Sequence, residues 1–238
     1  MKNNNIAIIP ARGGSKRVPR KNIKLFHGKP LIAYSIKTAL ESKLFDKIIV
    51  STDDDEIAQI AREYGAEVPF MRPKELSNDF TGVGAVVGHA LNWLKENGQN
   101  YDFYCLIYAT APLMQAKYLI EGFEKLKYSD ASKALSVTSM PFPIQRTFKI
   151  TPNNRCQMFW PENFMSRSQD LEEAYQDAGQ FCWKNIHNVA KDITFGSDTI
   201  PIILPRYLVQ DIDTLEDWQR TEYMYEAIER DKNAHREI

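Results

Sequence analysis

"NIAIIPARGGSKRVPRKN", residues 5–22, combines the features that decide the fold of this chain. The first six residues form a short apolar run, rich in β-branched side chains and closed by Pro10, which is typical of a buried strand. Two glycines and five cations follow, and an amphipathic segment of helical spacing comes next, at residues 29–42. A strand, a glycine-rich turn and a helix in this order predict the first unit of a parallel α/β sheet.

The alternation of strand and helix continues beyond this unit. Apolar runs rich in β-branched and aromatic residues predict further strands, at residues 47–54, 68–73, 102–109 and 199–205. Apolar residues at helical spacing predict further helices, at residues 54–65, 82–98, 116–128 and near the C-terminus. This order predicts an α/β fold built on a mainly parallel sheet.

Residues 141–188 interrupt the alternation. They are rich in Pro, Asn, Gln and aromatic residues and contain the extended patches TFKI, RCQMFW and GQFCWK, but no clear amphipathic helix. We interpret this segment as an inserted β-rich lobe and not as a linker, because its aromatic side chains need burial. A chain of 238 residues suits one large core, so we predict one domain, residues 1–238, that carries this lobe.

The composition limits the kinds of partner. The chain has 30 basic and 31 acidic side chains and a formal net charge of -1, so its overall charge favours neither nucleic acid nor an acidic membrane. An anion site must therefore be local. Three widely spaced cysteines form no CxxC pair, and no apolar stretch is long enough for a signal peptide or a membrane span, so we expect a reduced, cytoplasmic protein.

The basic loop after the first strand is the candidate anion site. In α/β sheets, ligands lie at the carboxyl ends of the strands, where a glycine-rich turn offers backbone N–H groups to phosphate. Gly13 and Gly14 allow the backbone to come close, and Arg12, Lys16 and Lys21 supply the charge to neutralise a triphosphate. The patterns GxxxxGK[ST] and GxGxxG are absent, which argues against a P-loop ATPase and a dinucleotide oxidoreductase. The alternative is a solvated basic loop.

A carboxylate pair near the C-terminus is the candidate metal site. Asp211 and Asp213 flank Ile212, so both carboxylates can face one way from an extended loop. Two carboxylates together with nucleotide phosphates suit Mg²⁺. The alternative is that this segment caps the final helix, through Asp213 or Thr214. The acidic segment STDD, residues 51–54, is interpreted first as a helix cap.

The segment IPARGGSKRVPRKN resembles the N-terminal signature of the acylneuraminate cytidylyltransferases, which make CMP-activated nine-carbon acid sugars from CTP. The similarity extends over nearly the whole chain, through STDDDEIAQIAREYGAEVPFMRPKEL, IYATAPL and DIDTLEDW. YQDAGQFCW and FPIQRTFKI most resemble the pseudaminic acid branch of the family, although Cys182 stands where an aromatic residue is expected.

The resemblance implies a fold, a reaction and an assembly. The fold is a three-layer, Rossmann-like nucleotidyltransferase fold with an inserted dimerisation lobe, and the assembly is a homodimer. The reaction is the Mg²⁺-dependent transfer of CMP from CTP to the anomeric hydroxyl of a nine-carbon acid sugar. Pseudaminic acid is the expected sugar, and N-acetylneuraminic, legionaminic or another 3-deoxy-ulosonic acid is the alternative. The resemblance also favours Asp211 and Asp213 as Mg²⁺ ligands and leaves Thr214 as the helix cap.

The same resemblance assigns residues to the two substrates. Catalytic roles fall to Arg12, Lys21, Asp211 and Asp213. The nucleotide side comprises the basic loop and two further positions: Ala11, Arg12, Gly13, Gly14, Ser15, Lys16, Lys21, Asn22, Arg72 and Thr81. The sugar side comprises Tyr108, Arg146, Gln180 and Phe181, with Lys184 as a second candidate cation for the sugar carboxylate.

Simpler roles compete with several of these assignments. Arg72 can form a surface salt bridge, and Tyr108 can be a core residue at a strand end. Thr81 or Asp79 can cap the helix that follows them. Two other functional classes fit the loop. A sugar-1-phosphate nucleotidyltransferase uses similar acid and metal chemistry, and a nucleotide- or RNA-binding module would use the loop without Mg²⁺.

Overall fold

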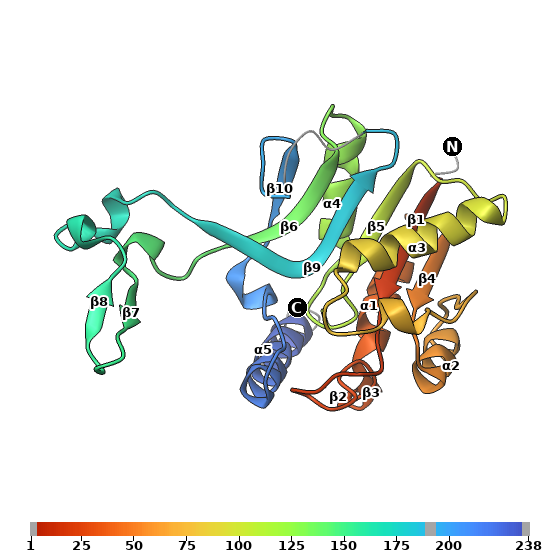
Figure 1. Cartoon of the computed structure of the whole chain (residues 1–238), viewed down its shortest axis with the longest axis horizontal. Coiled ribbons are helices and arrows are strands. Elements are labelled where there is room, and N and C mark those ends of the chain that lie inside the picture. The colour runs from red at the N-terminus through yellow and green to blue at the C-terminus, as the bar shows by residue number, and fades with distance from the viewer. Residues whose placement is uncertain (1–3, 189–193, 235–238) are drawn as a thin grey trace.

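A computed structural model describes residues 4–188 and 194–234 of the chain. A six-stranded sheet forms its centre, with the strand order β10-β6-β9-β5-β1-β4. Helices pack on both faces of this sheet, which gives three layers (Figure 1). The predicted three-layer α/β fold is therefore confirmed.

The sheet is mainly parallel. Its strands are β1 (Asn5–Pro10), β4 (Lys47–Ser51), β5 (Phe103–Ile107), β6 (Lys133–Ser139), β9 (Tyr175–Asn185) and β10 (Thr199–Ile203). β1 pairs in parallel with β4 and β5, and β6 pairs in parallel with β10. β9 lies antiparallel between β5 and β6. The carboxyl ends of the five parallel strands therefore lie at one edge of the sheet.

Helices α1 (Leu31–Ser42), α2 (Asp55–Glu63), α3 (Val83–Glu96) and α4 (Ala116–Lys127) bury their apolar faces against this sheet. Helix α5 (Leu215–Ala234) packs instead, through Trp218, against Phe26 and Leu31. Ala7 and Ile9 of β1 pack in the cluster with α1, α2 and α4, whereas Ile6 and Ile8 pack in the cluster with α3. This burial on both faces explains why β1 is a continuous apolar run. No helix in the described part of the chain is long and apolar enough to cross a membrane.

The segment at residues 68–73, predicted as a strand, does not form one. Met71 makes an isolated bridge to Thr52, and Glu67, just before the segment, makes another to Ile49 of β4. Pro69 and Pro73 carry no N–H group, so a continuous ladder cannot form here. A different small pair, β2 (Leu25–Phe26) with β3 (Lys29–Pro30), lies just before α1.

The start of α5 resolves the competing roles of the C-terminal acidic segment. Thr214 Oγ1 accepts a hydrogen bond from the Asp217 backbone N–H at 3.2 Å, and Asp217 Oδ2 accepts one from the Thr214 backbone N–H at 2.8 Å. This reciprocal pair is a capping box. Because Thr214 and Asp217 cap the helix, the Asp213 carboxylate is available for other contacts.

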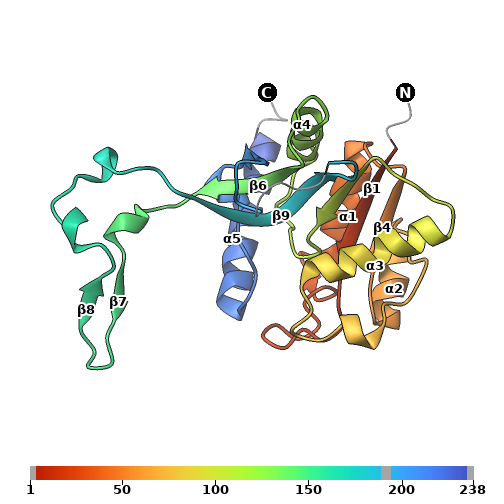
Figure 2. The same ribbon diagram turned by 45° about the horizontal axis from the view of Figure 1, so that its top comes forward.

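Residues 141–174, which we call the arm, project from the body of the molecule (Figures 1 and 2). The arm carries a hairpin of β7 (Phe148–Ile150) and β8 (Cys156–Met158) and short 3-10 turns. The patch GQFCWK, expected in the lobe, belongs instead to β9 of the central sheet.

The aromatic side chains of the arm, expected to be buried, are exposed in the single chain. The exposed apolar residues of the arm are Phe142, Phe148, Ile150, Phe159, Trp160, Phe164 and Met165. They are 40–85% exposed, and the arm that carries them extends away from the sheet (Figure 2).

Candidate active site

The basic loop, residues 11–22, follows β1 at the carboxyl edge of the sheet. The Ala11 backbone N–H donates to Ser51 O at 2.9 Å, which joins the start of the loop to the end of β4. The Asn22 side chain donates to Arg12 O at 2.9 Å, so the end of the loop is tied back to its beginning. The shape of the loop therefore depends on hydrogen bonds at both ends.

Asp53 and Asp54 fix the glycine turn from the side of β4. The Gly13 backbone N–H donates to Asp53 Oδ1 at 3.0 Å. Asp54 is the N-cap of α2, as predicted, because its Oδ1 accepts from the Ile57 N–H at 3.0 Å. Arg20 pairs with the same carboxylate and with Glu56, and holds the pKa of Asp54 below its ordinary value.

The two glycines of the turn are not equivalent. A Cβ atom on Gly13 would lie 2.6 Å from Asp54 Oδ2, which no real contact allows, whereas a Cβ on Gly14 would meet nothing within 4 Å. Gly13 is thus required by the close approach of Asp54. The openness around Gly14 leaves its backbone accessible to a ligand.

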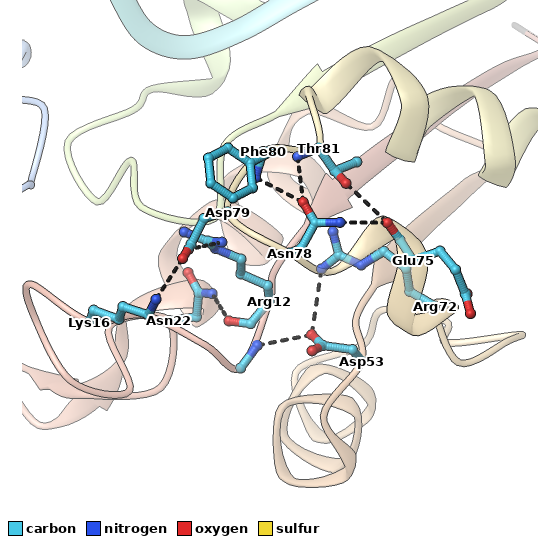
Figure 3. A network of polar contacts seen from close by, with 11 residues as sticks. Arg12, Lys16, Asn22, Asp53, Arg72, Glu75, Asn78, Asp79, Phe80 and Thr81 are labelled. Atoms are coloured by element: carbon cyan, nitrogen blue, oxygen red, sulfur yellow. Dashed lines mark hydrogen bonds and ion pairs between the residues drawn. The ribbon is translucent and has the colours of Figure 1, made fainter.

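Besides Arg20, the cations of the basic loop form two ion-pair groups. On one side Arg12 Nη1 lies 2.7 Å from Asp79 Oδ1, and Lys16 Nζ lies 2.6 Å from Asp79 Oδ2 (Figure 3). On the other side Arg17 Nη2 lies 2.7 Å from Asp213 Oδ1. Lys21 lies 3.8 Å from the same oxygen and also donates to the Ile212 carbonyl. The N-terminal loop and the C-terminal acidic segment therefore meet in space.

A pocket of about 460 Å³ opens between these groups. Its lining comes from the end of β1, the basic loop, the segment before α3 and the residue after β5. The lining residues are Pro10, Arg12, Ser15, Lys16, Arg17, Lys21, Asn22, Asp79 and Tyr108. The concentration of positive charge in one cavity suits a polyanionic ligand.

The electrostatics of the pocket follow from burial and from neighbouring charges. Burial lowers the pKa of Lys21, although the carboxylates of Asp213 and Asp211 oppose the shift. Loss of hydration, and then repulsion from Asp213, raises the pKa of Asp211. The raised pKa of Asp211 means that its charged form is poorly stabilised, and a divalent cation beside it would supply the missing positive charge.

Arg72 lies deep beside the basic loop and is not part of a surface salt bridge. Its side chain is only 4% exposed, and its Nη2 lies 3.8 Å from Asp53 Oδ1. Both Nε and Nη2 lack a hydrogen-bond partner in the described structure, and burial lowers the pKa of this guanidinium. Unsatisfied buried donors are costly, so this arginine is poised to contact an acceptor that enters from outside.

The segment around Thr81 approaches the pocket without capping α3. The N-cap of α3 is Gly82, which makes no side-chain cap. Thr81 Oγ1 donates instead to Glu75 O at 3.1 Å, and Asp79 pairs with the basic loop (Figure 3). The capping role considered for Thr81 and Asp79 is therefore wrong.

The four residues expected on the sugar side lie in different places. Tyr108 lines the pocket, and its backbone N–H donates to Gln180 O at 2.9 Å. The Gln180 side chain is buried, donates to Leu208 O at 2.6 Å and does not line the pocket. The Phe181 side chain is fully buried against α4 and does not line the pocket, contrary to expectation. Arg146 lies in the arm, where it contacts Ser168, and not in the pocket of its own chain. Lys184 pairs with Tyr104 near the amino end of β5, at the opposite edge of the sheet, so it cannot serve this pocket.

Arg17 and Asp79 are pocket residues that the sequence assignments omitted. Arg17 belongs to the same cationic cluster as Lys16, so the charge pattern offered a signal for it. The sequence contained no signal for Asp79, because its partners Arg12 and Lys16 lie 67 and 63 residues earlier in the chain.

The chain shares its fold with solved nucleotidyltransferases. CMP:2-keto-3-deoxy-manno-octonic acid synthetase, solved with CTP, superposes with a TM-score of 0.65 at 14% identity, over 94% of this chain and 98% of that one. 4-Diphosphocytidyl-2C-methyl-D-erythritol synthase from Anaerococcus prevotii gives a TM-score of 0.59 at 14% identity, over 93% and 98%. These likenesses show that the chain has the fold of these proteins, with its cationic pocket at the carboxyl edge of the sheet.

The sequence defines the family within this class. A family model described as cytidylyltransferase matches residues 6–151, and the chain belongs to this family. Pseudaminic acid cytidylyltransferase of Campylobacter jejuni (strain 81-176) is 45% identical over 94% of this chain and 97% of its own length. CMP-N,N'-diacetyllegionaminic acid synthase of Legionella pneumophila is 32% identical over 93% of this chain and 96% of its own length.

Proposed function

We propose that this protein transfers CMP from CTP to the anomeric hydroxyl of pseudaminic acid and releases pyrophosphate. The Campylobacter jejuni relative described above acts, by its name, on pseudaminic acid, and it matches over 94% of this chain. The observation that carries the proposal is that Lys21, which lines the pocket, lies 3.8 Å from Asp213. In the proposal, the cationic loop and the two carboxylates of the C-terminal segment therefore act on the same triphosphate.

The phosphates of CTP bind to the basic loop in this proposal. Arg12 and Lys16 hold the β- and γ-phosphates, where Arg supplies a forked contact and Lys a point charge. The backbone around Gly14 is open and can approach the phosphates closely. Lys21 lies at the reacting end beside Asp213 and faces the α-phosphate. Arg72 and Thr81 lie on the side of the nucleoside.

The acidic segment fits a magnesium ion. In the described part of the chain no group of three or more acidic, histidine or cysteine side chains is arranged as a metal site. Asp211 and Asp213 give two carboxylates, which is the number Mg²⁺ commonly takes from a protein when phosphates and water complete its shell. The raised pKa of Asp211 supports this fit. When bound, Mg²⁺ would polarise the α-phosphate.

Catalysis in this proposal is positioning and charge stabilisation. The sugar hydroxyl attacks the α-phosphorus, the bond to the β-phosphate oxygen breaks, and pyrophosphate carries away the charge. Arg12 and Lys16 stabilise that leaving group, and Lys21 stabilises the charge that develops on the α-phosphate. No covalent intermediate on the enzyme is required.

The acceptor sugar binds on the side of Tyr108 and Gln180. Such a sugar carries a carboxylate, so its site needs a further cation. Arg146 is our candidate, and it lies in the arm. An arm with many exposed apolar side chains supports a homodimer, in which Arg146 reaches the site of the second copy. We also propose a cytoplasmic location, where CTP is available.

A coupled pyrophosphate assay tests the proposed function. The protein is supplied with CTP and Mg²⁺ and with pseudaminic acid, N-acetylneuraminic acid or 3-deoxy-manno-octulosonate in parallel. We expect turnover with pseudaminic acid. Turnover with N-acetylneuraminic acid while pseudaminic acid stays inert would contradict the sugar assignment. Release of pyrophosphate from a sugar 1-phosphate and a nucleotide other than CTP would instead support a sugar-1-phosphate nucleotidyltransferase.

A further inference from the structure

The Asp79 carboxylate joins the two cations that we assign to the terminal phosphates. Its Oδ1 lies 2.7 Å from Arg12 Nη1, and its Oδ2 lies 2.6 Å from Lys16 Nζ (Figure 3). Each carboxylate oxygen takes one cation, as two oxygens of a phosphoryl group would. An anion that belongs to the chain thus lies where an anion of the substrate is expected.

The segment that carries Asp79 does not need this contact to keep its shape. Asn78 Oδ1 accepts from the backbone N–H groups of Phe80 and Thr81, at 2.8 and 2.9 Å. Asn78 Nδ2 and Thr81 Oγ1 both donate to Glu75 O, at 2.8 and 3.1 Å (Figure 3). The turn is therefore held by Asn78 and Thr81, while the Asp79 carboxylate points to the basic loop.

We propose that Asp79 is an internal competitor for the phosphate site and thereby sets which anions the pocket accepts. The inference rests on the proposed nucleotide site. A carboxylate tethered by a short segment has an effective concentration in the millimolar range or above. A small anion that contacts only one of the two cations cannot replace it. A pyrophosphate or triphosphate brings more charge and more oxygens, and so it displaces the carboxylate.

The exposure of the ion pairs makes this exchange feasible. The side chains of Lys16 and Asp79 are 79% and 41% exposed, and ion pairs in such surroundings are weak. The competitor is nevertheless charged under working conditions. Hydrogen bonds from Lys16 and then Arg12 hold the pKa of Asp79 below its ordinary value.

Calorimetric titration of the full-length protein with pyrophosphate, CTP and CMP tests the inference. Asp79→Asn removes the charge and keeps the size, so we expect pyrophosphate and CTP to bind about three- to ten-fold more tightly. CMP binding should not change, because its single phosphate lies by Lys21 in the proposed function. Asp79→Glu should stay close to the wild type. The matched control is Glu121→Gln, which removes a similarly exposed carboxylate paired with Lys125 on α4.

The possible outcomes separate the inference from the proposed function. Wild-type protein that binds neither CTP nor pyrophosphate overturns both. Wild-type protein that binds both ligands, with an Asn variant that binds them equally or more weakly, overturns only the role of Asp79. An equal gain for CMP also overturns it, since the effect would then be a change of overall charge. Asp79→Ser should repeat the Asn result, which guards against an effect of the new amide.

Discussion

Replacement of Gly13 by alanine tests how the glycine turn is built. The new Cβ atom would lie 2.6 Å from Asp54 Oδ2 and 3.0 Å from Asp54 Cβ, so the Asp54 side chain must move. This side chain cannot move freely, because it caps α2 through Ile57 and pairs with Arg20. The substitution therefore breaks contacts that lie outside the turn itself.

The size of the effect follows from the contacts that are lost. An N-cap contributes about 1 kcal/mol, and a partly exposed ion pair such as Arg20 with Asp54 contributes up to about 1 kcal/mol. We therefore expect Gly13→Ala to lower the free energy of unfolding by about 2 kcal/mol. For a chain of this size that corresponds to a melting temperature about 4–8 °C lower.

The prediction is checked by measuring the thermal and urea unfolding of Gly13→Ala and Gly14→Ala in parallel. Gly14 lies one residue away, and a Cβ there meets nothing within 4 Å, so this variant should melt near the wild-type temperature. Both variants gain the same small benefit from a stiffer unfolded chain. If the two variants are equally stable, the close approach of Asp54 is not what requires a glycine at position 13.

Three further changes test other parts of the account. Lys21→Met should lower kcat by about 100-fold or more with little change in melting temperature, because it removes positive charge at the α-phosphate. Lys37→Met, on the surface of α1, is the control. Near-normal turnover of Lys21→Met would refute the catalytic role of Lys21. The lowered pKa of Asp54 stabilises the fold above the ordinary aspartate pKa, and this contribution is lost as the pH falls through the lowered value. The stability difference between wild type and Asp54→Asn in urea should therefore shrink toward zero on acidification, and a constant difference contradicts the ion pair. Phe164→Glu in the arm should convert dimers to monomers by light scattering, whereas a wild-type monomer refutes the homodimer.

The regular elements were predictable because each one carries its own periodicity. β1 is a continuous apolar run since it is buried on both faces, and α1 repeats Ile32, Ile36 and Ala39 on its sheet-facing side. The 68–73 segment misled because its composition resembles a strand, while Pro69 and Pro73 prevent the ladder.

Pairings between distant segments were not predictable. Phe181 and Trp183 point to one face of β9 and Gln180 to the other, but a sequence does not tell which strands will flank β9. The cations of the basic loop were predictable from their density and from their place after β1. Asp79, their partner in the pocket, could not be assigned, because nothing near it in sequence indicates a contact with Arg12.

Crystals grown with CTP and Mn²⁺ in place of Mg²⁺ test the central claim most directly, through the anomalous scattering of manganese. The account predicts a manganese peak within coordination distance of Asp211 and Asp213, with the triphosphate against Arg12, Lys16 and Lys21. A triphosphate bound elsewhere on the molecule, or a manganese ion away from both carboxylates, would contradict it.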